Sequence, residues 1–316
     1  MLFTPIFNQT LVFFLLILLG FVLVKCKFVP EGTDKAISSL EKNVFLPALV
    51  LGTFIKQCTV DTLVSSWKLL LVGALFGVVV IPVSIAIIRA LFKTEDSRKI
   101  GTYALIFSNF GYMGNAMIIA VFPNVFFEYT IFTLPLTVIM YVWGIPALLL
   151  SDGKARGLKS RLKTLVNPML ICMLLGMLLG LSGLNMPAFI TTAIDSASAC
   201  MSPLAMILTG MVIAKIDLLQ FLKKWRIYVF VAIKVIVYPL VFLVIFYFIP
   251  QNSLITPTLL ICAACYMSMP TGLNPIVLPV AYGKDVSEAA GMAFISHLVG
   301  VLTIPLTFML LQNFLL

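Results

Sequence analysis

Residues 266–275, Tyr-Met-Ser-Met-Pro-Thr-Gly-Leu-Asn-Pro, lie in the middle of an apolar run that extends from about residue 255 to about residue 281. A run of this length is typical of a helix that spans a bilayer, because about 20 residues cross the hydrocarbon core. Its centre cannot be regular helix, since Pro270 and Pro275 lack an N–H and each leaves a carbonyl one turn earlier without its partner. Gly272 adds backbone freedom between the two prolines. Because open backbone in a membrane is tolerated where it is buried in protein or lines a wet cavity, the stretch predicts a broken helix around a polar site, as in many transporters.

The composition is that of an integral membrane protein. Of the 316 residues, 61% are hydrophobic and 10% are charged, whereas soluble domains have about 25% charged residues. The formal net charge of +9 is expected to come from cytoplasmic loops, where basic residues gather, and not from binding of a nucleic acid. There is no nucleotide-binding loop, and no cofactor is expected.

The cysteines do not indicate a disulfide framework, because most of the six lie in apolar runs and serve as small apolar side chains. Cys262 and Cys265 form a CxxC pair, but the chain has one histidine and no second cysteine pair, so no metal site is predicted. The first apolar run has no basic residue before it and no small-residue cleavage site after it. It is therefore expected to be a retained helix and not a signal peptide.

The hydrophobic pattern predicts an all-α protein with ten transmembrane helices. The ten segments are residues 5–24, 36–56, 67–91, 100–122, 128–150, 165–183, 188–214, 226–249, 255–281 and 288–314. Eighteen of the 21 basic residues follow the odd-numbered segments, and the alternate loops contain only Lys56 and Lys68. The positive-inside rule places the first set in the cytoplasm, and an even number of spans then places both termini outside.

The two halves of the chain resemble each other weakly. Residues 1–151 and 165–316 each contain five segments, and a basic linker at 152–164 separates them. Matching features in register are Trp67 and Trp225, Pro47 and Pro203, and Asn109-Phe110-Gly111 and Pro270-Thr271-Gly272. An odd number of helices per repeat inverts the second copy, and inverted repeats with paired broken helices form a secondary-transporter architecture.

The fourth segment is expected to contain the second broken helix. Its centre, residues 108–115, contains two glycines and two asparagines, which weaken a helix and supply amide donors and acceptors. The alternative is that these small residues only allow close helix packing in the membrane.

At these two sites the sequence resembles the auxin efflux carrier family of membrane transporters, and the resemblance covers nearly the whole chain. The two motifs that carry it are Asn109-x-Gly111-Tyr112-Met113-Gly114 and Met269-Pro270-Thr271-Gly272. Supporting matches are Asn167-Pro168, Pro203, Lys234-Val-Ile-Val-Tyr-Pro239, Ser296 and Pro305. Asn115 departs from the family pattern, since members often have a proline there.

The resemblance implies a fold like that of sodium/proton antiporters and bile acid transporters. Segments four and nine would cross at mid-membrane. Segments one, two, six and seven would form a scaffold, through which a homodimer is possible, and segments three to five and eight to ten would form a moving transport unit. The short central loop is more typical of a bacterial inner-membrane member than of the eukaryotic carriers.

The resemblance also implies a small organic anion as substrate, such as malate, malonate or an auxin-like acid, moved by elevator-type alternating access. The start of a half-helix carries free N–H groups and partial positive charge, which suits a carboxylate. The candidate substrate-binding residues are Asn109, Gly111, Tyr112, Gly114, Asn115, Pro270, Thr271, Gly272, Asn274 and Pro275.

Three further residues are candidates for a role in charge or coupling. Lys234 lies deep in a span, where a charge costs roughly 2.5–3.5 kcal/mol. It would attract the anion, act as a proton-linked switch, or pair with carbonyl groups at a half-helix end. Asp195 would bind a cation or proton, or would lie at the interface near the end of its span. His297 would act as a pH switch or would pack with its ring hydrogen-bonded in place.

Other classes of protein were weighed against a transporter. Gly180-Leu181-Ser182-Gly183 matches a short serine motif, so an intramembrane serine hydrolase would use Ser182 with His297. Neither paired aspartates nor an HExxH motif occurs, and the sequence predicts that the protein is not an enzyme. A transporter-like sensor has no attached signalling domain in its favour. A channel is less consistent with paired broken helices than alternating access is.

Overall fold

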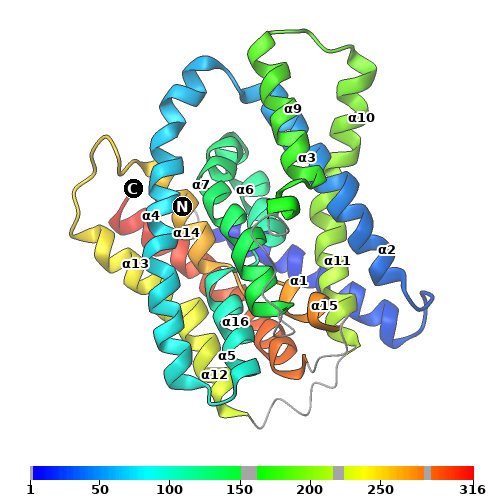
Figure 1. Cartoon of the computed structure of the whole chain (residues 1–316), viewed down its shortest axis with the longest axis vertical. Helices are drawn as coiled ribbons and strands as arrows, with labels where there is room; N and C mark the ends of the chain where they lie inside the picture. Colours follow the sequence, from blue (N-terminus) through cyan, green and yellow to red (C-terminus); the bar gives the residue numbers. More distant parts are fainter. Residues whose placement is uncertain (1–2, 151–161, 216–223, 281–285) are drawn as a thin grey trace.

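The computed structural model describes residues 3–150, 162–215, 224–280 and 286–316 (Figure 1). Over these ranges the chain is helical, and its one strand-like pairing is an isolated antiparallel bridge between Ser108 and Thr271. Most of the basic linker predicted at 152–164 lies outside the described residues.

The described part of the first half, residues 3–150, contains eleven named elements. They are α1 (Phe3–Lys25), α2 (Thr33–Leu40), η1 (Glu41–Phe45), α3 (Leu46–Gln57), α4 (Val60–Leu91), α5 (Glu95–Ile106), η2 (Phe110–Gly114), α6 (Asn115–Val121), η3 (Pro123–Val125), α7 (Phe126–Ile139) and η4 (Met140–Leu149). Elements η1, η2 and η4 are π-helical, and η3 is a 3-10 turn.

The described part of the second half begins with a 3-10 turn, η5 (Lys163–Leu165). The helices that follow are α9 (Pro168–Ser182), α10 (Ala188–Ala199), α11 (Met201–Ala214), α12 (Trp225–Ala232), the π-helical η7 (Ile233–Val237), α13 (Tyr238–Tyr247), α14 (Pro257–Ser268), α15 (Asn274–Val280) and α16 (Ser287–Phe314). Two helix starts combine a side-chain cap with a proline in the first turn. The Asn167 side chain accepts from Leu170 N–H, and the Thr256 hydroxyl accepts from Leu259 N–H.

Each of the ten predicted segments falls on helix, but they differ in how completely they match a membrane span. Within the described ranges, six continuous stretches are long and apolar enough to cross a membrane: Phe3–Lys25, Val60–Leu91, Pro123–Leu149, Ala188–Ala214, Trp225–Tyr247 and Ser287–Phe314. Of the other four segments, the second consists of α2, η1 and α3, and the sixth contains α9, which has 15 residues. The fourth and ninth segments are each divided into shorter helices. The chain is therefore an all-helical, multi-pass membrane protein.

Glycines allow the closest helix contacts. A Cβ atom on Gly20 of α1 would overlap the carbonyl oxygen of Ile207, and one on Gly210 of α11 would overlap that of Ile17. The two helices therefore lie backbone to backbone, each through its own glycine. Close approach of this kind stabilises helix pairs in membranes, where burial of apolar surface cannot drive association.

The helices pack in two groups (Figure 1). In one group, α1 and α2 contact α11, while α3 contacts α9 and α10. In the other, α4 contacts α5 and α7, and α14 contacts α7, α13 and α16. Helix α1 also contacts α16, and α11 contacts η2, so these helices line the boundary between the groups.

Contacts between helix ends divide the ends into two sets. The contacts are Lys215–Asp34 (2.5 Å), Lys224–Glu288 (3.5 Å), Lys56–Asp195 (2.6 Å) and Lys68 Nζ–Ser253 O (3.0 Å). The first two join ends that are predicted to be cytoplasmic, and the last two join ends predicted to be outside. Within the described part of the chain, no ion pair joins an end from one set to an end from the other.

Candidate substrate site at two helix interruptions

Two helix interruptions lie directly against each other. The first, residues 107–109, separates α5 from η2, and the second, residues 269–273, separates α14 from α15. The Asn109 N–H donates to the Pro270 carbonyl at 2.7 Å, and the bridge between Ser108 and Thr271 is adjacent. Both of the segments in which the sequence predicts a broken helix are thus interrupted.

The polar groups that the interruptions release find partners across the pair. Pro270 leaves the carbonyl of Tyr266 without a helical donor, and the hydroxyl of Ser108 donates to that carbonyl at 2.8 Å. In the second interruption, the Thr271 N–H donates to the Ser296 hydroxyl at 3.1 Å. A bilayer core contains no water that could bond these backbone groups, so the two serine hydroxyls supply the hydrogen bonds instead.

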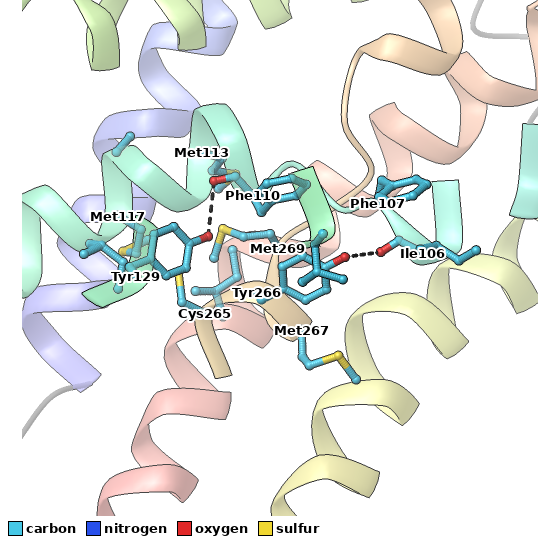
Figure 2. Packing of buried hydrophobic residues seen from close by; sticks show 14 of the residues in the cluster. Ile106, Phe107, Phe110, Met113, Met117, Tyr129, Cys265, Tyr266, Met267 and Met269 are labelled. Carbon is cyan, nitrogen blue, oxygen red and sulfur yellow. Dashed lines mark hydrogen bonds between the residues drawn. The ribbon is translucent and has the colours of Figure 1, made fainter. Parts of the chain in front are cut away.

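Two buried tyrosines donate hydrogen bonds to backbone carbonyl groups on either side of the first interruption (Figure 2). The hydroxyl of Tyr266 donates to the carbonyl of Ile106 at 2.6 Å, and that of Tyr129 donates to the carbonyl of Phe110 at 3.2 Å. Figure 2 shows both bonds among methionine, cysteine and aromatic side chains. The carbonyl group of Ile106, the last residue of α5, and that of Phe110, the first residue of η2, therefore each accept a hydrogen bond from a phenol.

Lys234 belongs to η7, and its side chain reaches the C-terminal end of α5. Its side chain is fully buried, and Nζ donates to the carbonyl of Leu105 at 3.0 Å. Among the three roles considered for Lys234, this geometry supports pairing with carbonyl groups at a half-helix end, where the helix dipole favours a cation.

The three candidate asparagines differ in what their amides contact. The Asn109 amide nitrogen lies 3.3 Å from Nε2 of His297, and the Asn274 amide donates to the Tyr103 hydroxyl at 2.9 Å. The Asn115 amide donates to the Gly111 carbonyl within its own turn, at 2.7 Å. Asn109 and Asn274 therefore link separate helices, whereas Asn115 stabilises the start of α6.

His297 is hydrogen-bonded at both ring nitrogens. Its Nδ1 lies 2.8 Å from the Ala293 carbonyl, which can only accept, so Nδ1 carries the proton. In the neutral ring, Nε2 then accepts from the Asn109 amide. The ring is satisfied in place and orients Asn109 at the first interruption.

The candidate threonine and glycines have different surroundings. The Thr271 hydroxyl is buried and has no hydrogen-bond partner within the described residues. A Cβ atom on Gly111 would meet nothing within 4 Å, whereas one on Gly114 would overlap the Tyr129 hydroxyl. A Cβ atom on Gly272 would make only ordinary contact with Ser108 and Asn109. Gly111 is therefore next to open space, and Gly114 is required by packing.

Asp195 lies away from the interruptions. Its carboxylate contacts Lys56 Nζ at 2.6 and 2.8 Å, and both side chains are about half exposed, at 52% and 54%. Ser182 donates to the Leu179 carbonyl at 2.7 Å and forms no hydrogen bond with His297, so the structure does not bring together the pair that a serine hydrolase needs.

Glu41 is a candidate that sequence reasoning missed. Its side chain is fully buried in η1, and neither carboxyl oxygen has a hydrogen-bond partner within the described residues. The carboxyl interacts electrostatically with the phenol of Tyr112 at the first interruption. The available signal was an acidic residue inside the second apolar segment, where a charge is costly and usually functional.

Two pockets of about 340 and 380 Å³ lie near the start of α5, and no residue of the two interruptions lines either one. In the described ranges, no three His, Cys, Asp or Glu side chains are grouped so that they would hold a metal ion.

Comparison with known proteins gives the family of this all-helical membrane protein. No curated protein sequence matches the chain. A family model described as membrane transport protein matches residues 5–308, which is nearly the whole chain. The protein therefore belongs to the auxin efflux carrier family and is a membrane transporter.

Proposed function

We propose that the protein is a secondary transporter that moves a small organic anion, such as malate, malonate or an auxin-like acid, by elevator-type alternating access. The anion is held between the two interruptions. The observation that carries the proposal is the hydrogen bond from Asn109 N–H to the Pro270 carbonyl, which joins two broken helices in the interior of a transporter.

The chemistry of the interruptions suits an anion. Residues 106–115 and 266–275 include no acidic side chain, while the amides of Asn109 and Asn274 and the unpartnered hydroxyl of Thr271 supply donors. Donors that are neutral and fixed in place bind a carboxylate without the cost of burying a second charge. A side-chain atom added at Gly111 would meet nothing within 4 Å, so the backbone beside the first interruption is open on that side.

The packing of the helices supports alternating access. The group that contains α1, α2, α3, α9, α10 and α11 corresponds to the proposed scaffold, and the group that contains both interruptions corresponds to the proposed transport unit. Movement of one group against the other would carry the site from one side of the membrane to the other while its hydrogen bonds stay intact. We also propose that both termini lie outside.

The test is the thermal stability of the purified protein in detergent with a panel of malate, malonate and indole-3-acetate. A ligand that binds the folded state raises Tm, and at about 100 times its Kd it adds about 2.7 kcal/mol of stability. We expect a carboxylate to raise the Tm of wild type and of Asn185→Ala, a control in the exposed loop after α9. Asn274→Ala should remove the shift.

The same panel includes sodium ions and a neutral sugar. If one of these raises Tm and no carboxylate does, the anion proposal is wrong, although the family assignment is unaffected. If a carboxylate stabilises Asn274→Ala as well as wild type, the anion binds away from the interruptions.

A further inference from the structure

Glu41 lies at the boundary between the two helix groups. It begins the π-turn η1 between α2 and α3, in the group proposed as the scaffold, and its side chain is fully buried. Tyr112, with which it interacts electrostatically, belongs to η2 in the other group. The acid therefore faces an element that is proposed to move.

The carboxyl group of Glu41 is buried away from water, and no hydrogen bond from a described residue replaces those it would form with water. Burying an ionised carboxylate that has neither a counterion nor hydrogen bonds costs several kcal/mol, so a carboxyl group in such a place usually keeps its proton. Both oxygens of Glu41 lack a partner within the described residues. The neutral acid is the less costly form in this arrangement.

Among the described residues, no cation forms an ion pair or hydrogen bond with Glu41. The elements packed against η1 are α2, α3, α9, α10 and α11. The other titratable side chains on η1, on these elements and at their cap positions are Asp34, Lys35, Lys42, Lys56, Cys172, Asp195, Cys200 and Lys215. Asp34 pairs with Lys215 and Asp195 pairs with Lys56, while Lys35 and Lys42 are exposed. None of these groups forms a hydrogen bond to Glu41.

The phenol of Tyr112 is near Glu41, and those of Tyr103 and Tyr141 are near Tyr112. Tyr112 interacts electrostatically with Glu41 and with Tyr141, and Tyr103 interacts with both of these tyrosines. The Tyr103 hydroxyl accepts the hydrogen bond from the Asn274 amide. Glu41 is therefore near Tyr112, one of the residues proposed to hold the anion.

We propose that Glu41 is a proton-binding site whose occupancy is linked to binding of the anion between the interruptions. The link rests on the proposed function. An anion at the interruptions and a carboxylate at Glu41 repel each other, so arrival of the anion favours formation of an O–H bond on a Glu41 oxygen, with the proton taken from solution. Departure of the anion reverses this, and lower pH strengthens anion binding in this conformation.

The proton site is tested first without any anion, from the Tm of the purified full-length protein between about pH 6 and about pH 9. A folded state that keeps a proton which the unfolded chain releases loses stability as the pH rises. We expect the Tm of wild type and of Glu31→Gln, an exposed control on the loop before α2, to fall over this range. The fall should be clearly smaller in Glu41→Gln.

The link is tested by titration calorimetry with malonate in two buffers of different protonation enthalpy. We expect wild type to take up a measurable fraction of a proton, up to about one, for each malonate bound. Glu41→Gln should bind malonate without this uptake. Glu41→Met has similar volume and no titratable group, so it replaces the glutamine variant if that variant does not fold.

The outcomes separate the two proposals. A wild-type Tm that does not fall with rising pH, or an equal fall in wild type and in the Glu41 variants, overturns the proton site. Malonate binding to wild type without proton uptake overturns the link and leaves the proposed function intact. If neither malonate nor any other carboxylate of the panel binds, the proposed function fails and the link fails with it, while the Tm measurements still decide the proton site.

Discussion

At the scale of single residues, the site depends on how a membrane protein satisfies backbone groups that a proline has released. Pro270 removes the donor for the Tyr266 carbonyl, and the Ser108 hydroxyl supplies one from a residue that is 158 positions away. Ser296 accepts from the Thr271 N–H in the same way. Each serine therefore replaces a backbone partner, and the cost of losing one is the cost of an unsatisfied buried group.

This dependence predicts that Ser108→Ala destabilises the protein by about 1–3 kcal/mol, because the Tyr266 carbonyl is left buried without a donor. Ser182→Ala is the control, since Ser182 is exposed at the end of α9, and changes at exposed positions usually stay within about 0.5 kcal/mol. The measurement is the Tm of both variants in the same detergent. Equal values for the two variants would show that the Ser108 bond contributes nothing.

At the scale of elements, the sequence predicts what depends on local pattern and misses what depends on packing. The apolar runs and the prolines at 270 and 275 predict the helices and the interruption between α14 and α15. The partners of the released groups are not predictable in this way, because Ser108 and Ser296 are distant in sequence from the groups they bind. Glu41 was missed for the same reason, since its burial is decided by five elements packed around η1.

Packing of α1 against α11 gives a prediction at this scale. Gly210→Ala places a methyl group where the Ile17 carbonyl lies, so the two helices must separate, at a cost of about 1–3 kcal/mol. Gly300→Ala is the matched control on α16, because its added methyl would make only ordinary contact with Ile304. Helix propensity favours alanine at both positions.

The Tm of the two variants separates packing from propensity. We expect a clear fall for Gly210→Ala and no fall for Gly300→Ala. If Gly210→Ala is as stable as wild type, α1 and α11 are not held by backbone contact.

At the scale of the whole molecule, the charge pattern and the contacts between helix ends give the same division into two sides. Lys215 with Asp34 and Lys224 with Glu288 join ends that are predicted to be cytoplasmic. The loop after α1 belongs to the same side by its basic residues. A probe of that loop therefore tests the orientation of the molecule.

Cys26 is a natural probe, because it is exposed in this loop and the other five cysteines are buried or partly buried. We expect a membrane-impermeant maleimide to label the protein in inside-out vesicles and to leave it unlabelled in intact spheroplasts. Cys26→Ser should remove the labelling in vesicles, which excludes reaction at the partly buried Cys172 and Cys200.

The opposite side has its own probe in the exposed loop between α9 and α10. In the Cys26→Ser background, Asn185→Cys should be labelled in spheroplasts and protected in inside-out vesicles. Labelling of Cys26 in spheroplasts together with protection of Asn185→Cys would mean that the chain is inserted the other way round. Labelling of both positions from one side would instead contradict the number of spans between α1 and α10, because that number decides whether the two loops lie on opposite sides.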